Sequence, residues 1–285
     1  MKILLLEKIK NIKNLNMLPL VVTKLLEVTS NPKSSVKDVS KVVESDFTLS
    51  ANILKIVNSP FYGFPRKITT INEALVILGF ADIRNIALSL TVFDKLSSTG
   101  QLDINQFWKH SLGVGVGAKI LAEKIKYAKP EEAFICGLIH DIGKIILSEY
   151  FQDKFAQIMA VINSNDVYSW EAEESVLDGI NHAQIGGWVT EKWKIPQLVT
   201  RTVALHHSPM IAGKIDDLAA CVNVSDHICK LKGIGYKGDK KQPAIEPHII
   251  EFFGLSGAVV EDIVNKMDKK IAQAEIFLKI GQKKG

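Results

Sequence analysis

The chain has 285 residues, of which 47% are hydrophobic and 23% charged, the composition of an ordinary soluble globular protein. The net charge of +4 is too small and too dispersed to indicate a nucleic-acid surface. The three cysteines form no CxxC pair and are typical of buried thiols in a reducing compartment. No signal peptide or membrane-spanning run is predicted, so we expect a cytoplasmic protein.

Apolar residues recur at helical spacing through the first hundred residues. Asn31-Pro32 ends the first run, and Ser34 or Ser35 offers an N-cap for the second. The segment FYGFPRKITT has no apolar period and contains glycine and proline, which predicts a loop over 61–70. The predicted helices cover residues 18–28, 36–43, 45–57, 70–79 and 82–93.

The polar run SSTGQLD, residues 97–103, predicts a division between an N-terminal lobe, 1–98, and the remainder, 99–285. The Gly-, Lys- and Pro-rich segment 232–247 predicts a mobile surface loop. No strand is predicted, so the expected fold class is all-α. The predicted helices beyond the boundary cover 105–126, 130–141, 151–162, 169–177, 182–193, 196–207, 215–231, 248–253 and 258–280.

The stretch AFICGLIHDIGKIIL, residues 133–147, ends an apolar helix in His140-Asp141. Burial of an imidazole beside a carboxylate is costly unless a partner compensates, and a divalent metal ion takes both kinds of ligand. Gly143 is expected to let the chain turn at the helix end, and Lys144 to place a cation beside an anion at the metal. The alternative is a helix C-terminus with His and Lys near its negative end. This stretch alone favours neither interpretation.

Five of the seven histidines and two aspartates lie on separate predicted helices or helix ends, each on an apolar face. One such histidine is more often a core residue than a ligand, but the whole set favours a metal site. Adjacent histidines in ALHHSP cannot share one face of a regular helix, although at a helix end they can serve two ions. Mixed nitrogen and oxygen donors suit Fe, Mn, Zn or Ni better than Ca or Mg. The set is His110, His140, Asp141, His182, His206, His207 and Asp226.

The order H…HD…H…HH…D resembles the HD superfamily of metal-dependent phosphohydrolases, particularly its HD-GYP branch. The N-terminal half, with LPLVVTKLLEV, SD before FTLSANILKIVNSPFYG, and ITTINEALVILGFADIRNIALS, resembles the HDOD (HD-related output domain) family of bacterial signalling proteins. That resemblance covers roughly residues 15–209. It implies an all-helical fold in which an N-terminal lobe packs on an HD-like bundle.

The resemblance also implies roles for the candidate ligands and for Lys144. His110, His140, Asp141 and Asp226 would hold one metal, and Asp141 would bridge to a second ion held by His182, His206 and His207. Asp141 and Lys144 would be the catalytic residues, with Lys144 contacting a phosphate. Two divalent transition-metal ions are expected, Fe or Mn before Zn or Ni. SPMIAGK follows the paired histidines instead of a GYP motif, so the resemblance does not extend to cyclic-di-GMP specificity.

Three functions compete. The first is a signal-transduction module that retains a metal site and acts through a signalling partner or a phosphate-containing small molecule. The second is an active phosphohydrolase or phosphodiesterase acting on a nucleotide or cyclic dinucleotide. The third is nucleic-acid binding through residues 39–58, but LSANILKIVNS is apolar and offers only Lys55 as a basic contact, so we expect no nucleic-acid partner. No membrane partner is expected.

Overall fold

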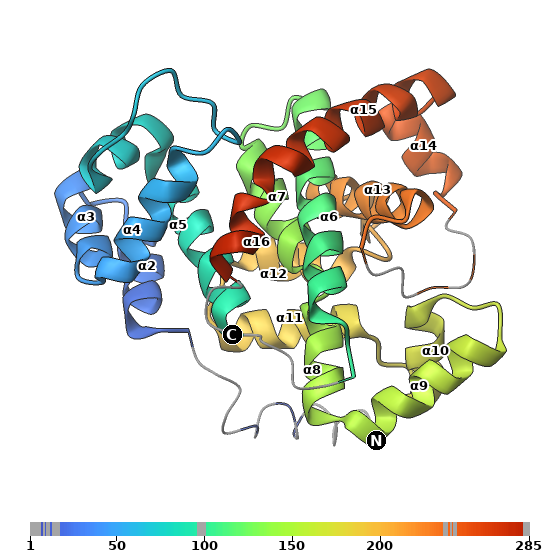
Figure 1. Ribbon diagram of the computed structural model, residues 1–285. Coiled ribbons are helices and arrows are strands. Elements are labelled where there is room, and N and C mark those ends of the chain that lie inside the picture. Colours follow the sequence, from blue (N-terminus) through green and yellow to red (C-terminus); the bar gives the residue numbers. More distant parts are fainter. Residues whose placement is uncertain are drawn as a thin grey trace. The chain divides into compact units, whose positions relative to one another are not determined.

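The computed structural model describes residues 7, 9, 12, 18–95, 101–235, 239, 241 and 244–281 (Figure 1). The predicted all-α fold is confirmed. The helices are α2 (Leu20–Ser30), α3 (Val36–Glu44), α4 (Phe47–Val57), α5 (Ile71–Lys95), α6 (Ile104–Lys124), α7 (Pro130–Ile139), α8 (Ile142–Tyr150), α9 (Gln152–Ser164), α10 (Ser169–Val176), α11 (His182–Lys192), α12 (Gln197–Leu205), α13 (Asp217–Lys232), α14 (Pro247–Phe253), α15 (Gly257–Ala274) and α16 (Ile276–Gly281).

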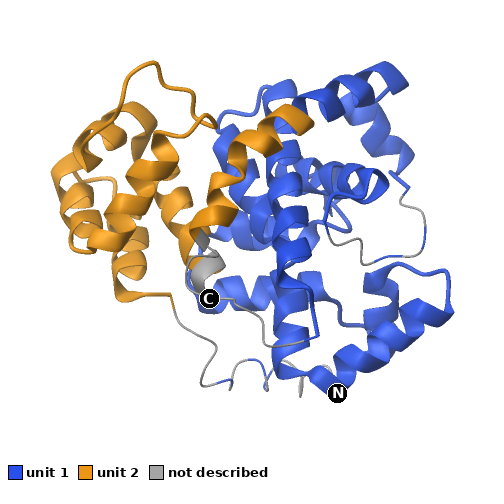
Figure 2. Cartoon of the chain, viewed as in Figure 1, with its two compact units in different colours: residues 1–15, 97–267 blue, residues 16–96, 268–285 orange. Residues whose placement is uncertain are grey.

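The chain forms two compact units, one comprising residues 1–15 and 97–267 and the other residues 16–96 and 268–285 (Figure 2). In the second unit, here called unit 2, helices α2 to α5 bury an aliphatic core. Ser35 and Asp38 form a capping box that begins α3, and Asp46 caps α4 by accepting a hydrogen bond from the Leu49 amide. The C-terminal helix α16 completes this core, because Phe277 is fully buried.

Helix α5 contains the two helices predicted over 70–79 and 82–93, joined at Gly79. This glycine has φ 85° and ψ 171°, a conformation that interrupts the helix and favours glycine. The expectation that no run is long enough to span a membrane was wrong for this stretch, since Ile71–Val92 is sufficiently long and apolar. About half of its most apolar window, 56%, is buried inside the protein, and the kink divides it.

The other unit, unit 1, is built around α6, α7 and α13. Gly115 of α6 and Gly137 of α7 lie against each other so closely that a Cβ on Gly137 would come within 2.8 Å of the Gly115 backbone. The two helix axes therefore approach at small residues, and both helices are buried along almost their whole length. This crossing brings His110, on α6 a short distance before Gly115, and His140, at the end of α7, to the same region.

Two local predictions were wrong. Residues 210–215 form an antiparallel hairpin, β1 (Met210–Ile211) and β2 (Lys214–Ile215), where no strand was predicted. Two-residue strands are too short to show an alternating apolar pattern. Both central residues of the turn, Ala212 and Gly213, have positive φ, but only Gly213 is a residue type that predicts such a turn. Gly143 lies inside α8 and does not form a turn, because the chain re-enters a helix immediately after Asp141.

Candidate metal centre

One half of the candidate centre joins α6 to α13. His110 is buried on α6, and its Nε2 lies 3.0 Å from Oδ1 of Asp226 on α13. The Nδ1 of the same imidazole lies 3.3 Å from the Ile234 carbonyl oxygen, which fixes the ring orientation. Asp226 is fully buried on an otherwise apolar helix face, as its sequence context predicted.

His140 and Asp141 lie at the junction of α7 and α8. The Nδ1 of His140 donates to the Gly137 carbonyl at 2.7 Å, which orients Nε2 toward two carboxylates. That Nε2 lies 3.4 Å from Asp141 Oδ2 and 4.0 Å from Asp226 Oδ1. His110, His140 and Asp141 thus form one group of potential ligands whose donor atoms all lie within 4.8 Å of one another.

A second group lies on the other side of Asp141. The Nε2 of His182, at the start of α11, is 2.9 Å from Asp141 Oδ1, and the Nε2 of His206 is 3.7 Å from the same oxygen. His207 Nε2 lies 2.8 Å from His182 Nε2. Helix α12 ends at Leu205, so the two adjacent histidines occupy a helix end, where both can point inward. The structure therefore brings all seven predicted ligands together.

Several donor atoms in this cluster are buried and have no hydrogen-bond partner among the described residues. Their nearest oppositely charged or imidazole partners lie 2.9 to 3.7 Å away. Two atoms held at about 2.1 Å by one metal lie about 3–3.5 Å apart, and the separations between neighbouring donor atoms in this cluster run from 2.8 to 4.0 Å. The residues present therefore suit metal binding in two groups, and Asp141 contacts histidines of both. The unpartnered atoms are His110 Nε2, His140 Nε2, His206 Nε2, Asp141 Oδ1 and Asp226 Oδ1.

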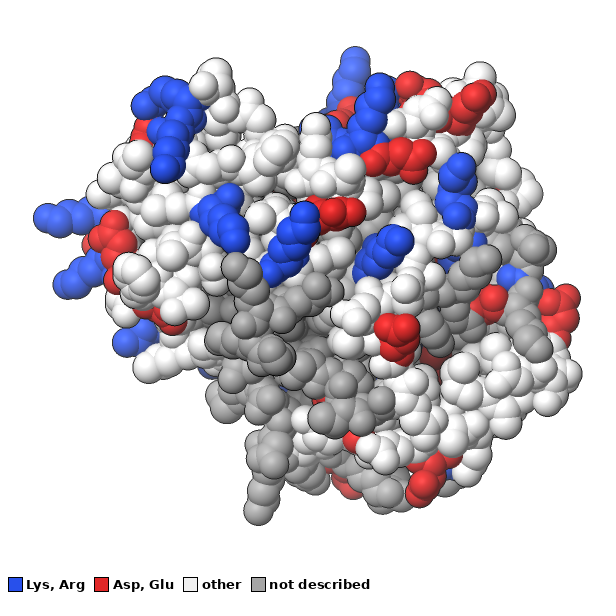
Figure 3. Space-filling model, viewed as in Figure 1, with Lys and Arg blue, Asp and Glu red and all other residues white. Residues whose placement is uncertain are grey.

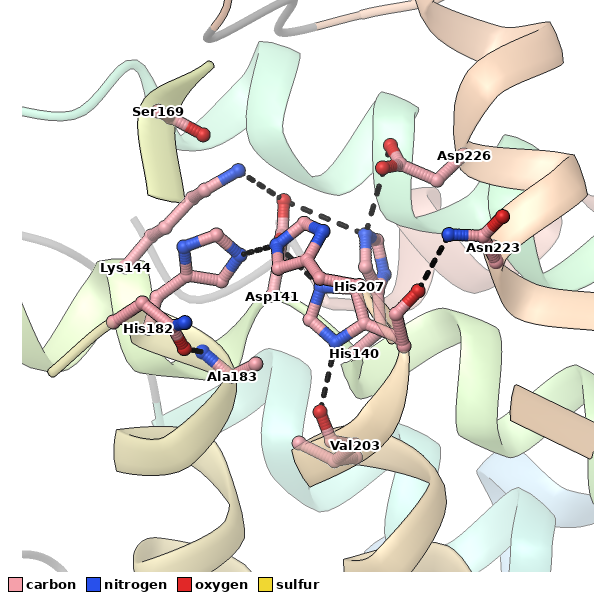
Figure 4. A network of polar contacts seen from close by, with 12 residues as sticks. His140, Asp141, Lys144, Ser169, His182, Ala183, Val203, His207, Asn223 and Asp226 are labelled. Atoms are coloured by element: carbon pink, nitrogen blue, oxygen red, sulfur yellow. Dashed lines mark hydrogen bonds and ion pairs between the residues drawn. The ribbon is translucent and has the colours of Figure 1, made fainter. Parts of the chain in front are cut away.

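Two lysines neutralise the carboxylates of the centre. Lys144 Nζ lies 2.7 Å from Asp141 Oδ2, and Lys230 Nζ lies 2.8 Å from Asp226 Oδ2. Each lysine therefore holds the oxygen that faces away from most of the imidazoles. The predicted phosphate contact of Lys144 is not tested by this geometry, although its ammonium lies beside the shared ligand (Figure 4).

The protonation states suit metal binding. Burial lowers the pKa of His140 to about 4, against the opposing effect of Asp141 and Asp226. Burial and the neighbouring His140 and His182 rings hold the pKa of His206 well below its usual range. Burial opposes ionisation of Asp141, but His140 and Lys144 outweigh it and hold the carboxyl pKa well below 3.8. Neutral imidazoles beside ionised carboxylates are the ligand forms that metals require.

Glu173 was missed by the sequence analysis. This buried carboxylate on α10 accepts from the backbone amide and from Nδ1 of His182, both at 2.6 Å. Burial lowers the pKa of His182, but Glu173 and Asp141 outweigh that effect and raise it. A carboxylate behind a metal-binding histidine fixes its tautomer and increases its basicity. The sequence SWEAEESV offers several acids on one short helix, and nothing in its pattern distinguishes the inward one.

Replacing Glu173 with glutamine is expected to weaken metal binding by about 10–100-fold, because the amide donates less electron density to His182. Titration of chelator-treated protein with Mn²⁺ against a metal indicator measures the effect. The matched variant is Glu174→Gln, since Glu174 contacts Asn181 and does not contact a histidine. Equal affinities in the two variants would contradict a role for Glu173 at the metal.

Acid is expected to destabilise the metal-free protein. The lowered pKa values of His140 and His206 mean that the unfolded chain binds more protons than the folded chain from pH 6.5 down to about 4. The free energy of unfolding therefore falls as the pH is lowered through this range. Burial also holds the pKa of His207 well below its usual range. The raised pKa of His182 acts oppositely, but it is one imidazole against three. Urea denaturation in chelator at about pH 7.5 and about pH 5 tests this, and equal stability would contradict it.

The helical fold and the His-Asp cluster define an HD-like helical protein. The HDOD domain model matches residues 15–209, so the chain belongs to the HDOD family. The matched range includes six of the seven clustered residues and excludes Asp226.

Two curated relatives are uncharacterized proteins. One, from Treponema pallidum (strain Nichols), is 25% identical over 195 residues, which cover 67% of this chain and 38% of the relative. The other, YuxH from Bacillus subtilis (strain 168), is 29% identical over 152 residues, 50% of this chain and 37% of the relative. The matched region thus spans well under half the length of either relative.

Solved structures share the fold. An HDOD domain protein of unknown function from Geobacter sulfurreducens is 24% identical with a TM-score of 0.77, covering 99% of this chain and 97% of that chain. A predicted phosphohydrolase from Shewanella amazonensis SB2B is 24% identical with a TM-score of 0.71, covering 94% and 97%. A predicted signal transduction protein from Marinobacter aquaeolei VT8 is 22% identical with a TM-score of 0.71, covering 96% and 64%.

Proposed function

We propose that this chain is a cytoplasmic bacterial signal-transduction protein that carries an HD-type two-metal site and acts by binding a phosphate-containing ligand or a signalling partner. The observation that carries the proposal is the convergence of buried, unpartnered imidazole and carboxylate atoms on both sides of Asp141. Such atoms are costly to bury unless a metal compensates them. The mixed donors favour Fe or Mn, with Zn or Ni as the other candidates.

Membership of the HDOD family supports a regulatory role, and so does the name of the Marinobacter protein with the same fold. A nucleic-acid partner is not proposed. On the face that Figure 3 shows, acidic and basic side chains are intermixed, whereas nucleic-acid binding requires a surface of predominantly positive charge.

Hydrolysis of a phosphate ester is the second candidate function. It is favoured by Lys144, whose ammonium lies at the carboxylate of Asp141, and by the name of the Shewanella protein of this fold. Two bound metals would acidify a water and stabilise the oxygens of the reacting phosphate. The chain itself would orient the metal ligands through Glu173 and Gly137, and Lys144 would neutralise charge that develops on the phosphate.

Half-site variants test the proposed function. Chelator-treated protein is reloaded with Mn²⁺ or Fe²⁺, dialysed and analysed for metal. About two ions per chain are expected in the wild type, and about one in His110→Ala or in His207→Ala, since each variant removes a ligand from one group only. His248→Ala is the matched control, because His248 is exposed and outside the cluster. A wild-type protein that retains no metal would contradict the proposal.

Turnover separates the two candidate functions. Hydrolysis of a chromogenic phosphodiester by the loaded protein, lost in Lys144→Met with metal content retained, would support the enzyme. A loaded protein that is inert toward phosphate mono- and diesters would support the binding protein.

A further inference from the structure

Asp239 is a buried acidic residue beside the candidate metal centre that neither function uses. Its side chain is 3% exposed, although it comes from the segment 232–247 that was predicted to be a surface loop. The residue as a whole is half-buried, so its side chain points inward from a segment whose described residues are otherwise exposed or half-buried. Asp239 Oδ1 accepts a short hydrogen bond from the backbone amide of Ser169, and Oδ2 lies 2.6 Å from Lys230 Nζ. The carboxylate of a residue outside the helices is thus held by one backbone amide and one lysine ammonium group.

The donors around Asp239 resemble those of an anion-binding site. Ser169 is the first residue of α10, so its amide is one of those that a helix leaves without an internal partner, at the positive end of the helix dipole. The Ser169 hydroxyl is buried and has no hydrogen-bond partner among the described residues. Figure 4 shows this hydroxyl pointing toward the ammonium of Lys144. The Ser169 amide and the Lys230 ammonium therefore hold the Asp239 carboxylate, and the buried Ser169 hydroxyl beside that amide has no hydrogen-bond partner among the described residues.

Lys230 connects Asp239 with the metal centre. Lys230 Nζ lies between Asp226 Oδ2 and Asp239 Oδ2, and Lys144 Nζ is already bound to Asp141. The Asp239 carboxylate is therefore one ammonium group away from Asp226, a predicted ligand of one metal. Phosphate oxygens accept charge-assisted hydrogen bonds from ammonium groups and helix amides as carboxylate oxygens do.

We infer that Asp239 occupies an anion subsite formed by Ser169 and Lys230, and that a phosphate group of a ligand displaces its carboxylate there. The inference rests on the proposed function in one respect, namely that the rest of the phosphate-containing ligand lies beside the metals. The subsite consists of residues that are not themselves predicted ligands. Its consequence is that the free protein competes with its own ligand, because the carboxylate must leave before the phosphate can bind.

The test measures binding of inorganic phosphate to chelator-treated protein by equilibrium dialysis at constant ionic strength. Asp239→Ala is expected to bind phosphate about tenfold more tightly or better, because the competing and repelling carboxylate is removed. Asp239→Asn keeps the side-chain volume without the charge, is expected to shift affinity in the same direction, and replaces the alanine variant if that one folds poorly. Unchanged affinity in both variants would overturn the inference.

A second substitution tests the donor. Ser169→Pro removes both the amide hydrogen and the hydroxyl, and proline is tolerated at the first position of a helix. Tyr168, with φ −72° and ψ 151°, already has a conformation compatible with a following proline. Combined with Asp239→Ala, this change is expected to abolish the gain in phosphate affinity. A retained gain would overturn the inference.

The matched control is Asp262→Ala, which removes an exposed aspartate that is paired with Lys266 at 2.6 Å. An equal gain in this control would show a general charge effect and overturn the inference. Metal analysis separates the two proposals. Tighter phosphate binding by Asp239→Ala in a protein that retains no metal would support the subsite and contradict the metal site. Two retained ions without tighter phosphate binding by Asp239→Ala would support the metal site and contradict the subsite.

Discussion

Asp141→Ala is expected to abolish retention of both metal ions. Asp141 Oδ1 lies 2.9 Å from His182 Nε2 and Oδ2 lies 3.4 Å from His140 Nε2, so this one carboxylate reaches both groups of candidate ligands. No other described residue has contacts of this kind to both groups. The half-site variants should each lose one ion, whereas this variant should lose two. Metal analysis after reloading and dialysis gives the number directly.

The same substitution should also destabilise the metal-free protein. Asp141 and Lys144 form a buried ion pair, and removal of one partner from such a pair costs about 3–5 kcal/mol. Asp141→Asn preserves the shape of the side chain and should lose the metal ions with a smaller loss of stability. Asp166→Ala, at an exposed position, is the control for both measurements. Two ions retained by Asp141→Asn would contradict the bridging role.

Gly143→Ala is expected to lower the free energy of unfolding by about 3 kcal/mol, because overpacking against backbone cannot relax through a side-chain rotamer. A Cβ at Gly143 would overlap the carbonyl oxygen of His182 and approach the Gly186 amide to 3.0 Å. Relief of that overlap would separate the starts of α8 and α11, which carry Asp141 and His182. Metal affinity should therefore fall together with stability.

Gly257→Ala is the matched comparison, since no atom lies within 4 Å of a Cβ added there. Urea denaturation of both variants and the wild type measures the difference. If Gly143→Ala were as stable as Gly257→Ala, the close approach of α8 to α11 would be contradicted.

Local sequence signals were sufficient for most helices. The caps at Ser35, Asp46 and Asp103 accept hydrogen bonds from their own first turns, so a short stretch of sequence determines each start. Helix α8 was not predicted, because Ile142, Ile145 and Ile146 are buried together and leave no polar face to reveal a helical period. The role of Gly143 was also misinterpreted. A glycine is required there because the backbone of α11 passes too close for a side chain, and the sequence does not show which backbone segments lie close together.

The candidate centre could be predicted in outline. Histidines and aspartates on apolar faces must converge in a helical bundle, and the seven predicted residues do. The residues behind them could not be predicted, because Glu173 and Asp239 lie in polar stretches where one inward carboxylate resembles its exposed neighbours. Their roles depend on partners from distant helices, and a single sequence contains no signal for such pairs.

The order of the chain has a consequence for synthesis. Unit 2 includes α16, whose Phe277 packs edge-on against Phe61 with ring centroids 5.7 Å apart, and unit 1 needs Asp226 of α13 for its centre. A ribosome makes α16 after all the other described helices, and α13 after α2 to α12. Unit 2 therefore cannot complete its core before α16 is made, and unit 1 cannot complete its candidate ligands before α13 is made. We expect nascent α2 to α5 to depend on chaperones until α16 follows them.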